Sequence, residues 1–226
     1  MFGVVGGVGS GKSALCSAVA ERWDLAVLDG DAAGHEALRE DAVKIALHDR
    51  FGAEIFFAHG DLAHREIDRS KLAAKVFGPG KQAALAALEA IVHPVIRRRL
   101  LSEAEDLLAS GYEAVLLDAA VLLETGWRDL CEKVVFVDVP RSERLRRVAS
   151  RGWDAAELDR RETSQWSLDR KRAAADATVD NGGLLADAVR SFDDLLQAWG
   201  VEPSPAAPVR AARPDLFAQP AAAVTN

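Results

Sequence analysis

The sequence contains few cysteines and no long apolar stretch. Cys16 and Cys131 are the only cysteines among 226 residues, and no C-x-x-C pair occurs, so neither a disulfide framework nor a cysteine-based zinc site is indicated. No run approaches ~18 consecutive apolar residues, and no signal peptide precedes the first apolar segment. The net charge of −7 gives no reason to expect nucleic acid or a membrane surface as a partner. We therefore expect a cytoplasmic globular protein that is a monomer or weak oligomer.

Glycine is concentrated in one informative stretch, Gly6 to Ser13. It reads Gly-Gly-Val-Gly-Ser-Gly-Lys-Ser and matches the P-loop pattern G-x-x-x-x-G-K-[ST] at every fixed position. The glycines let backbone N–H groups approach phosphate oxygens, and the following helix directs its positive end at the same anion. Lys12 can reach the β- and γ-phosphates, and the Ser13 hydroxyl can bind Mg²⁺. An apolar run before the loop and a helical pattern after it argue against a chance glycine-rich turn. The stretch predicts nucleotide-phosphate binding.

The next apolar segment, residues 25–29, reads as a buried strand ending in Asp29-Gly30-Asp31. Ligands of open α/β sheets collect at the carboxyl ends of the strands, so these two carboxylates are expected near the phosphates. One of them can cap the following helix instead. Asp31 is further from the strand, and we expect it to be the one that reaches substrate.

Residues 33–110 read as mostly helical. One helix is expected to end at Gly52, a second to stop before Gly78-Pro79-Gly80, and a third to run from about Gln82 to Leu108. His93-Pro94 predicts a boundary or kink in the third helix, because proline removes a helix hydrogen bond. So long an insertion suggests a helical subdomain that grips a substrate, although a plain helical cover on the sheet is the alternative. His59 and His64 within it lack helical metal-ligand spacing, so the pair does not indicate a metal site.

Two further apolar strands are expected at residues 113–118 and 133–139. Asp118 ends the first and resembles the Walker B carboxylate that helps to hold Mg²⁺, although a turn residue at a strand end is the alternative. A loop from Ala119 to Glu124 follows, with Glu124 as its single acid.

Residues 141–172 differ from the rest of the chain. They hold nine Arg and one Lys against six acidic residues. Arg144, Arg147 and Arg151 are spaced to share one helical face. Guanidinium groups suit a transferring phosphoryl group because each can bond two oxygens. An arginine-rich helical hairpin is what a kinase lid would look like, whereas the alternative is a solvated helix surface.

The chain closes with a short strand at 177–180, a turn at Asn181-Gly182-Gly183, and an amphipathic helix at 184–199 capped by Gly200. Residues 201–226 are rich in Ala and Pro, and we expect a disordered tail there.

With these segments placed, residues 2–198 resemble the dephospho-CoA kinases, which are P-loop kinases of the nucleoside-monophosphate-kinase type. The P-loop is shared with many kinases, and the more specific matches lie elsewhere: Asp29-Gly30-Asp31, Gly60-Asp61-Leu62 through Arg65, Ile91 to Ile96, Asp118 to Glu124, and Gln165 through Arg172 followed by Ala175-Asp176 and Asp180-Asn181-Gly182. The sequence departs from the family at a few positions. The family's proline in the P-L-L-F-E loop is Ala120 and the next Leu is Val121; Ala14 replaces a second hydroxyl residue of the P-loop; and Gly30 replaces an alanine.

The resemblance implies an α/β, P-loop NTPase three-layer fold with a five-stranded parallel sheet. It assigns residues 1–32, 111–140 and 173–200 to the nucleotide-binding core, 33–110 to a helical acceptor-binding subdomain, 141–172 to the lid and 201–226 to the tail. The implied reaction transfers the ATP γ-phosphoryl group to the ribose 3′-hydroxyl of dephospho-CoA, with ATP and dephospho-CoA as the ligands and Mg²⁺ as cofactor.

The resemblance and the residue chemistry together assign site roles. The implied catalytic residues are Lys12, Asp31, Arg147 and Arg151; the ATP-binding residues are Gly9, Ser10, Gly11, Lys12, Ser13 and Ala14; the acceptor-binding residues are Asp31, His93 and Glu124; and the implied Mg²⁺ ligand is Ser13, with Asp118 as a second candidate. Asp31 would accept or orient the hydroxyl proton. A carboxylate with an ordinary pKa near 4 is a weak base, so orientation can matter more than proton removal.

Three alternatives stay open at this point. Another small-molecule P-loop kinase, acting on a nucleoside or nucleoside monophosphate, would share most of these features. A GTPase-like switch would need a guanine-reading N-K-x-D motif, which the sequence lacks. An inactive binding protein is disfavoured by Lys12, Ser13 and Asp31.

Overall fold

The structure is a computed structural model, and it describes residues 1–57 and 65–202. His59, His64, Gly60-Asp61-Leu62 and nearly all of the expected tail therefore lie outside the described residues. No helix within the described part of the chain is both long enough and apolar enough to cross a membrane.

Five parallel strands form the central sheet of the described residues, in the order β2-β3-β1-β4-β5. They are β1 (Phe2–Gly6), β2 (Ala26–Asp29), β3 (Val115–Asp118), β4 (Lys133–Asp138) and β5 (Ala177–Asp180). The β1, β3 and β4 interiors are almost entirely buried, as expected for strands covered on both faces. The predicted fold class is confirmed. Because all the strands run in the same direction, their carboxyl ends share one edge of the sheet.

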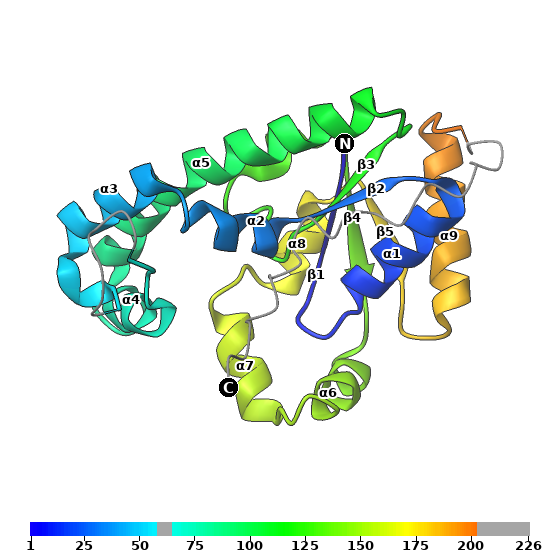
Figure 1. The fold of residues 1–226 in the computed structure, drawn as a ribbon. Helices are drawn as coiled ribbons and strands as arrows, with labels where there is room; N and C mark the ends of the chain where they lie inside the picture. The colour runs from blue at the N-terminus through cyan, green and yellow to red at the C-terminus, as the bar shows by residue number, and fades with distance from the viewer. Residues whose placement is uncertain (58–64, 203–226) are drawn as a thin grey trace, which may run out of the picture.

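Helices cover both faces of the sheet (Figure 1). On one face, α1 (Lys12–Trp23) and α9 (Leu185–Ala198) bury Leu15, Val19 and Phe192 against the strands. The other face is covered by α5 (Gln82–Ala109) and α8 (Leu168–Ala174), whose apolar side chains join a second core cluster. Gly200, at a φ of +78°, follows the last helix and confirms the expected stop.

The insertion between β2 and β3 consists of α2 (Gly30–Ala37), α3 (Asp41–Phe51), the 3₁₀ turn η1 (Ala53–Ile55), α4 (Arg69–Val76) and α5. The expected helix ends at Gly52 and before Gly78 are confirmed. The Asp68 side chain accepts hydrogen bonds from the N–H groups of Ser70 and Lys71 and caps α4, an arrangement worth about 1 kcal/mol.

Of the boundary or kink expected at His93-Pro94, the boundary is wrong. Helix α5 runs without interruption through Pro94 for 28 residues. Proline deletes only its own N–H bond to the preceding turn, and the packing of Val92, Ile96 and Leu100 in the core holds both halves of the helix in place.

The arginine-rich segment forms a helical hairpin made of α6 (Arg141–Ala149) and α7 (Ala155–Thr163), which lies at the bottom of Figure 1 next to the loop after β1. Arg141 pairs with Asp159 at 2.7 Å and joins the two helices. The expectation that Arg151 shares a helical face with Arg144 and Arg147 is wrong. Helix α6 ends at Ala149, and Gly152 (φ +75°) turns the chain into α7, so Arg151 lies in the turn.

Candidate active site

The P-loop joins β1 to α1 at the centre of the sheet. Gly9 and Gly11 both adopt a φ of +78°, a conformation that side chains other than glycine rarely tolerate. Ser10 is buried and donates its N–H to the Gly7 carbonyl oxygen at 3.1 Å, which tightens the loop. In the described chain no side chain caps α1 and no acid lies in its first turn. The N–H groups at the start of α1 are thus open to an anion.

Three carboxylates meet beside this loop at the carboxyl edge of the sheet. Asp29 and Asp118 are register partners on β2 and β3, and Asp118 lies opposite Val4 of the central strand. A side-chain hydrogen bond links Asp118 to Ser13. Burial raises the pKa of Asp118, while the Ser13 bond and the positive charge of Lys12 oppose the rise. The two residues expected to hold Mg²⁺ are therefore in contact.

Asp29 takes the helix-capping role that was one alternative for this pair. Asp29 accepts hydrogen bonds from the N–H groups of Asp31 (2.8 Å) and Ala32 (3.0 Å) and caps α2. Asp31 stays open to solvent, but the protein atoms around it desolvate its carboxyl group and raise its pKa. The negative charges of Asp29 and Asp118 raise this pKa further, whereas Lys12 and His35 lower it. Asp31 therefore sits in the electrostatic field of the P-loop lysine and both other carboxylates.

The arginine-rich hairpin packs directly on the P-loop through two arginines. Arg144 is buried; it donates to the carbonyl oxygens of Val139 (3.2 Å) and Val8 (3.3 Å) and pairs with Glu162 of α7. A Cβ on Gly9 would lie 2.8 Å from Val148 of α6, so the close contact requires glycine.

Arg147 lies against the far end of the P-loop. Its guanidinium group donates to the carbonyl oxygens of Ser10 (3.1 Å) and Asn181 (2.7 Å), and its Nε pairs with Glu143. Arg151 lies at the turn between α6 and α7, with its guanidinium carbon 5.8 Å from the Trp153 ring centre. Among the described residues, Arg147 contacts the P-loop, whereas Arg151 makes no hydrogen bond or ion pair with it.

His93 lies on α5, and Glu124 lies in the loop that follows β3. His93 of α5 is half-buried and meets the Trp127 ring edge-on at 6.1 Å; burial lowers its pKa, opposed by the charge of Glu89. Glu124 accepts a hydrogen bond from the N–H of Trp166 at 2.7 Å and pairs with Lys171 at 3.0 Å. A Cβ on Gly30 would lie 3.3 Å from the same Trp127 ring. The ring therefore packs against the start of α2, which carries Asp31.

Asn181 was missed as a site residue. It is buried at the carboxyl end of β5, and its side chain donates to the Ser10 carbonyl oxygen at 2.8 Å. The sequence signal was its place directly after an expected strand, where the rule that located Asp31 also applies.

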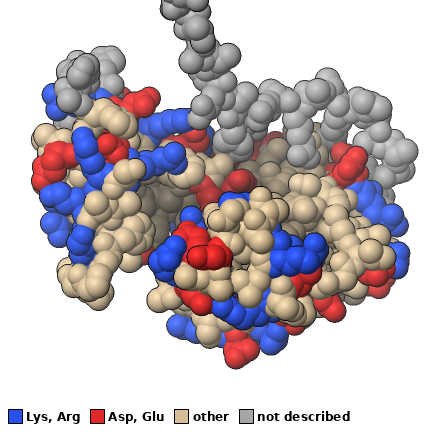
Figure 2. Space-filling view, turned by 90° about the horizontal axis from the view of Figure 1, so that it is seen from below, with Lys and Arg blue, Asp and Glu red and all other residues tan. Residues whose placement is uncertain are grey.

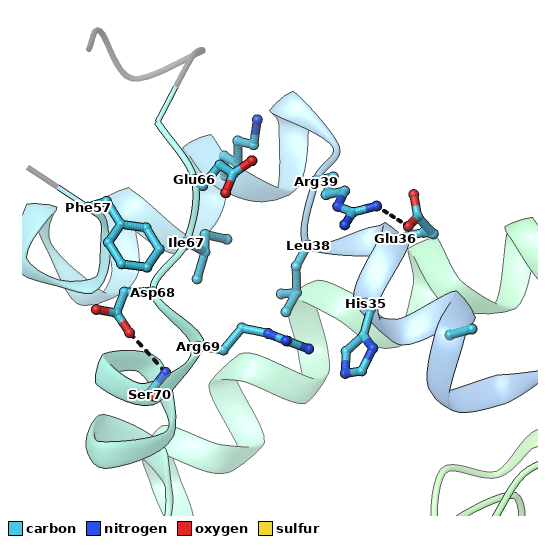
Figure 3. Close-up of a pocket in the computed structure, with 12 residues that line it drawn as sticks. His35, Glu36, Leu38, Arg39, Phe57, Glu66, Ile67, Asp68, Arg69 and Ser70 are labelled. Atoms are coloured by element: carbon cyan, nitrogen blue, oxygen red, sulfur yellow. Dashed lines mark hydrogen bonds and ion pairs between the residues drawn. The ribbon is translucent and has the colours of Figure 1, made fainter. Parts of the chain in front are cut away.

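A cavity of about 670 Å³ opens beside Asp31, lined in part by Ala32 and His35 of α2 and by Asp68 and Arg69 at the start of α4. Arg69 and His35 point toward each other across it, and the paired Glu36 and Arg39 form one wall (Figure 3). Figure 2 shows the surface hollowed between the insertion on the left and the rest of the molecule.

Parallel sheet, P-loop, carboxylate cluster and arginine-rich hairpin define a P-loop kinase of small molecules. A family model described as dephospho-CoA kinase matches residues 1–187. The chain belongs to the dephospho-CoA kinase family. It is a kinase that transfers phosphate from ATP to an alcohol group of dephospho-CoA, the last step of coenzyme A biosynthesis.

Individual relatives agree. The dephospho-CoA kinase of Geobacillus kaustophilus is 36% identical over 201 residues, covering 88% of this chain and 96% of that protein. The one from Anaeromyxobacter dehalogenans is 35% identical and covers 93% of this chain and 99% of that protein. A crystal structure of TT1252 from Thermus thermophilus has a TM-score of 0.70 and 32% identity, covering 87% of this chain and 96% of that one. A shikimate kinase from Acinetobacter baumannii, with a TM-score of 0.51 and 15% identity, shares the fold alone.

Proposed function

We propose that the reaction takes place between the P-loop and Asp31, and that the accepting group is the ribose 3′-hydroxyl of dephospho-CoA. The observation that carries this assignment is electrostatic. The charges of Lys12, Asp29 and Asp118 all act on the Asp31 carboxyl group, so a group bonded to Asp31 lies within the same field as the ATP phosphates. In-line transfer needs positioning more than covalent chemistry.

ATP is held by the N–H groups from Gly9 to Ala14 and by the Lys12 ammonium. Both glycines with positive φ support this role, as does the open start of α1. Arg147, whose guanidinium group lies against the P-loop, neutralises charge that develops on the transferred group. Arg151 lies in the turn between α6 and α7, so it takes the same role only when the hairpin closes further over the P-loop.

Magnesium fits the residues at this edge. The Ser13 hydroxyl and the Asp118 carboxylate are hydrogen-bonded to each other and supply the hard oxygen ligands that Mg²⁺ prefers. Ser13 would hold the ion and Asp118 would help, directly or through water. When bound, Mg²⁺ neutralises charge on the β- and γ-phosphates.

Asp31 orients the acceptor hydroxyl and accepts its proton. Because its pKa is raised, the Asp31 carboxylate is a better base than an ordinary one. The positive charge of Lys12 opposes this rise in pKa. Asp29 keeps the turn in shape by capping α2.

The rest of dephospho-CoA occupies the cavity beside Asp31. Arg39, Lys44 and Arg69 line it, and cations suit the diphosphate of the acceptor. His93 and Glu124 bound the acceptor site on the opposite side, next to the Trp127 ring and the base of the lid. The insertion, residues 33–110, therefore acts as the acceptor-binding subdomain, and residues 141–172 act as a lid that excludes water.

The enzyme acts in the cytoplasm as a monomer or weak oligomer, without nucleic acid or a membrane. Two features support this: both cysteines are free, buried thiols, which suits a reducing compartment, and the net charge is −7.

The decisive experiment measures ADP release from Mg-ATP with dephospho-CoA, and with AMP, dCMP and adenosine as control acceptors. The proposal requires ADP release with dephospho-CoA and with none of the control acceptors. NMR of the product should show the new phosphate on the 3′-oxygen. Release with a control acceptor alone would keep the P-loop kinase fold and overturn the acceptor assignment.

A further inference from the structure

Lys171 is the most completely buried charged side chain in the described part of the chain, with no exposed surface. It lies in α8, at the end of the segment 141–172 that we propose as the lid. Its ammonium group is bonded to the Ala120 carbonyl oxygen (2.6 Å), the Gln165 side-chain oxygen (2.8 Å) and the Glu124 carboxylate (3.0 Å). An ammonium group has three N–H donors, so all three are used.

These bonds join two segments whose relative position matters for the proposed reaction. Gln165 belongs to the return of the lid between α7 and α8, whereas Ala120 and Glu124 belong to the loop after β3. The Trp166 N–H adds a second bond from the lid return to the same Glu124 oxygen. Burying an ion pair is costly, and apolar side chains could fill the space at least as stably. The pair therefore points to a requirement for a defined position rather than for stability alone.

The Lys171 contacts continue toward Asp31 through packing. Ala119 adjoins the carbonyl that Lys171 holds, and a Cβ on Gly30 would lie only 2.7 Å from the Ala119 Cβ. Gly30 separates Asp29 from Asp31. One hydrogen bond and the close packing of the Ala119 methyl group on Gly30 thus connect the Lys171 ammonium to the segment that carries Asp31.

We propose that Lys171 is a positioning residue that holds the loop of residues 119–124 between the lid return and the Asp29–Asp31 turn, so that the acceptor hydroxyl, and not water, faces the ATP γ-phosphoryl group. The inference rests on the proposed function and requires no contact between Lys171 and substrate. With the loop held, the acceptor oxygen forms the new P–O bond, the bond between the γ-phosphorus and the ADP oxygen breaks, and the hydroxyl proton passes to Asp31. With the loop released, water makes the same attack and yields ADP and inorganic phosphate.

The test compares Lys171→Met with wild type at saturating Mg-ATP and dephospho-CoA, counting ADP and CoA in the same sample. Lys133→Met is the matched control, because Lys133 pairs with Asp176 at the opposite end of the sheet. We expect one ADP per CoA from wild type and from Lys133→Met. For Lys171→Met we expect about two or more ADP per CoA, and CoA formation reduced about tenfold or more.

The product ratio separates positioning from stability, because a partly unfolded sample loses rate but keeps its ratio. One ADP per CoA from Lys171→Met would overturn the proposal whatever its rate. If Lys171→Met does not fold, Gln165→Leu removes one of the three acceptors with little change in volume. A ratio above that of wild type then supports the proposal, and an unchanged ratio overturns it. Absence of CoA from wild type would instead reject the proposed function itself.

Discussion

The side chain of Asn181 donates a 2.8 Å hydrogen bond to the backbone carbonyl oxygen of Ser10, across 171 residues of sequence. Arg147 donates to the same oxygen at 3.1 Å and also to the Asn181 carbonyl oxygen. The central residue of the P-loop is thus held by the end of the last strand and by the first helix of the lid. Both contacts bear on the loop that receives the ATP phosphates.

Asn181→Asp should weaken ATP binding by about tenfold. The carboxylate has nearly the same shape but cannot donate, and a lost buried hydrogen bond costs about 1–3 kcal/mol. Isothermal titration with a non-hydrolysed ATP analogue measures the change. Thr178→Val on the exposed side of β5 should bind as wild type does. Unchanged affinity in a folded Asn181→Asp sample would show that the P-loop keeps its shape without this bond.

Asp31→Asn should lower kcat by about 10²- to 10⁴-fold and leave the ATP dissociation constant almost unchanged, because the amide can neither accept the proton nor balance the charge of the attacking oxygen. Asp29→Asn is the matched control. Asparagine also caps helix starts, so this variant should retain α2 and most of the activity. If kcat and ATP affinity fell together in Asp31→Asn, the assignment of Asp31 to the acceptor hydroxyl would be rejected.

The fall of kcat/KM at low pH should report the protonation of the Asp31 carboxylate. Its pKa is raised first by desolvation and next by the negative charge of Asp29, and activity requires the ionised form. Acceptor kcat/KM should therefore fall as the pH drops through this raised pKa. Asp29→Asn removes the second cause and lowers the pKa, so its acid limb should shift to lower pH relative to wild type. A shift to higher pH, or none, would assign the limb to another group.

Gly30→Ala should destabilise the protein by about 1–3 kcal/mol, because the new Cβ would lie 2.7 Å from the Ala119 Cβ. Urea unfolding measures the loss, and the double variant with Ala119→Gly should recover most of it. Gly34→Ala, in the same helix, is the control: its Cβ would meet only Ile96 at 3.8 Å, so helix propensity should stabilise it by about 0.5–1 kcal/mol. Equal effects of the two substitutions would contradict the close packing of Gly30.

Packing against the loop after β3 explains why position 30 holds glycine where the family has alanine. Ala119 and Trp127 lie so close beneath the turn that only glycine fits without movement. This crowding couples the turn to neighbours about 90 to 100 residues away in the sequence, and no local pattern around Asp29 indicates it. Sequence reasoning therefore noted the departure but had no physical reason for it.

Features that depend on local chemistry could be predicted from the residues alone. The glycines and lysine of residues 6–13 specify a phosphate-binding turn, apolar runs specify buried strands, and an aspartate after a strand specifies a carboxylate at the carboxyl edge of the sheet. The continuation of α5 through Pro94, the end of α6 before Arg151, and the partners of Asn181 and Lys171 became visible only in the folded chain. These outcomes depend on core packing and on hydrogen bonds between distant segments. Spacing along one helix or strand therefore contains no signal for them.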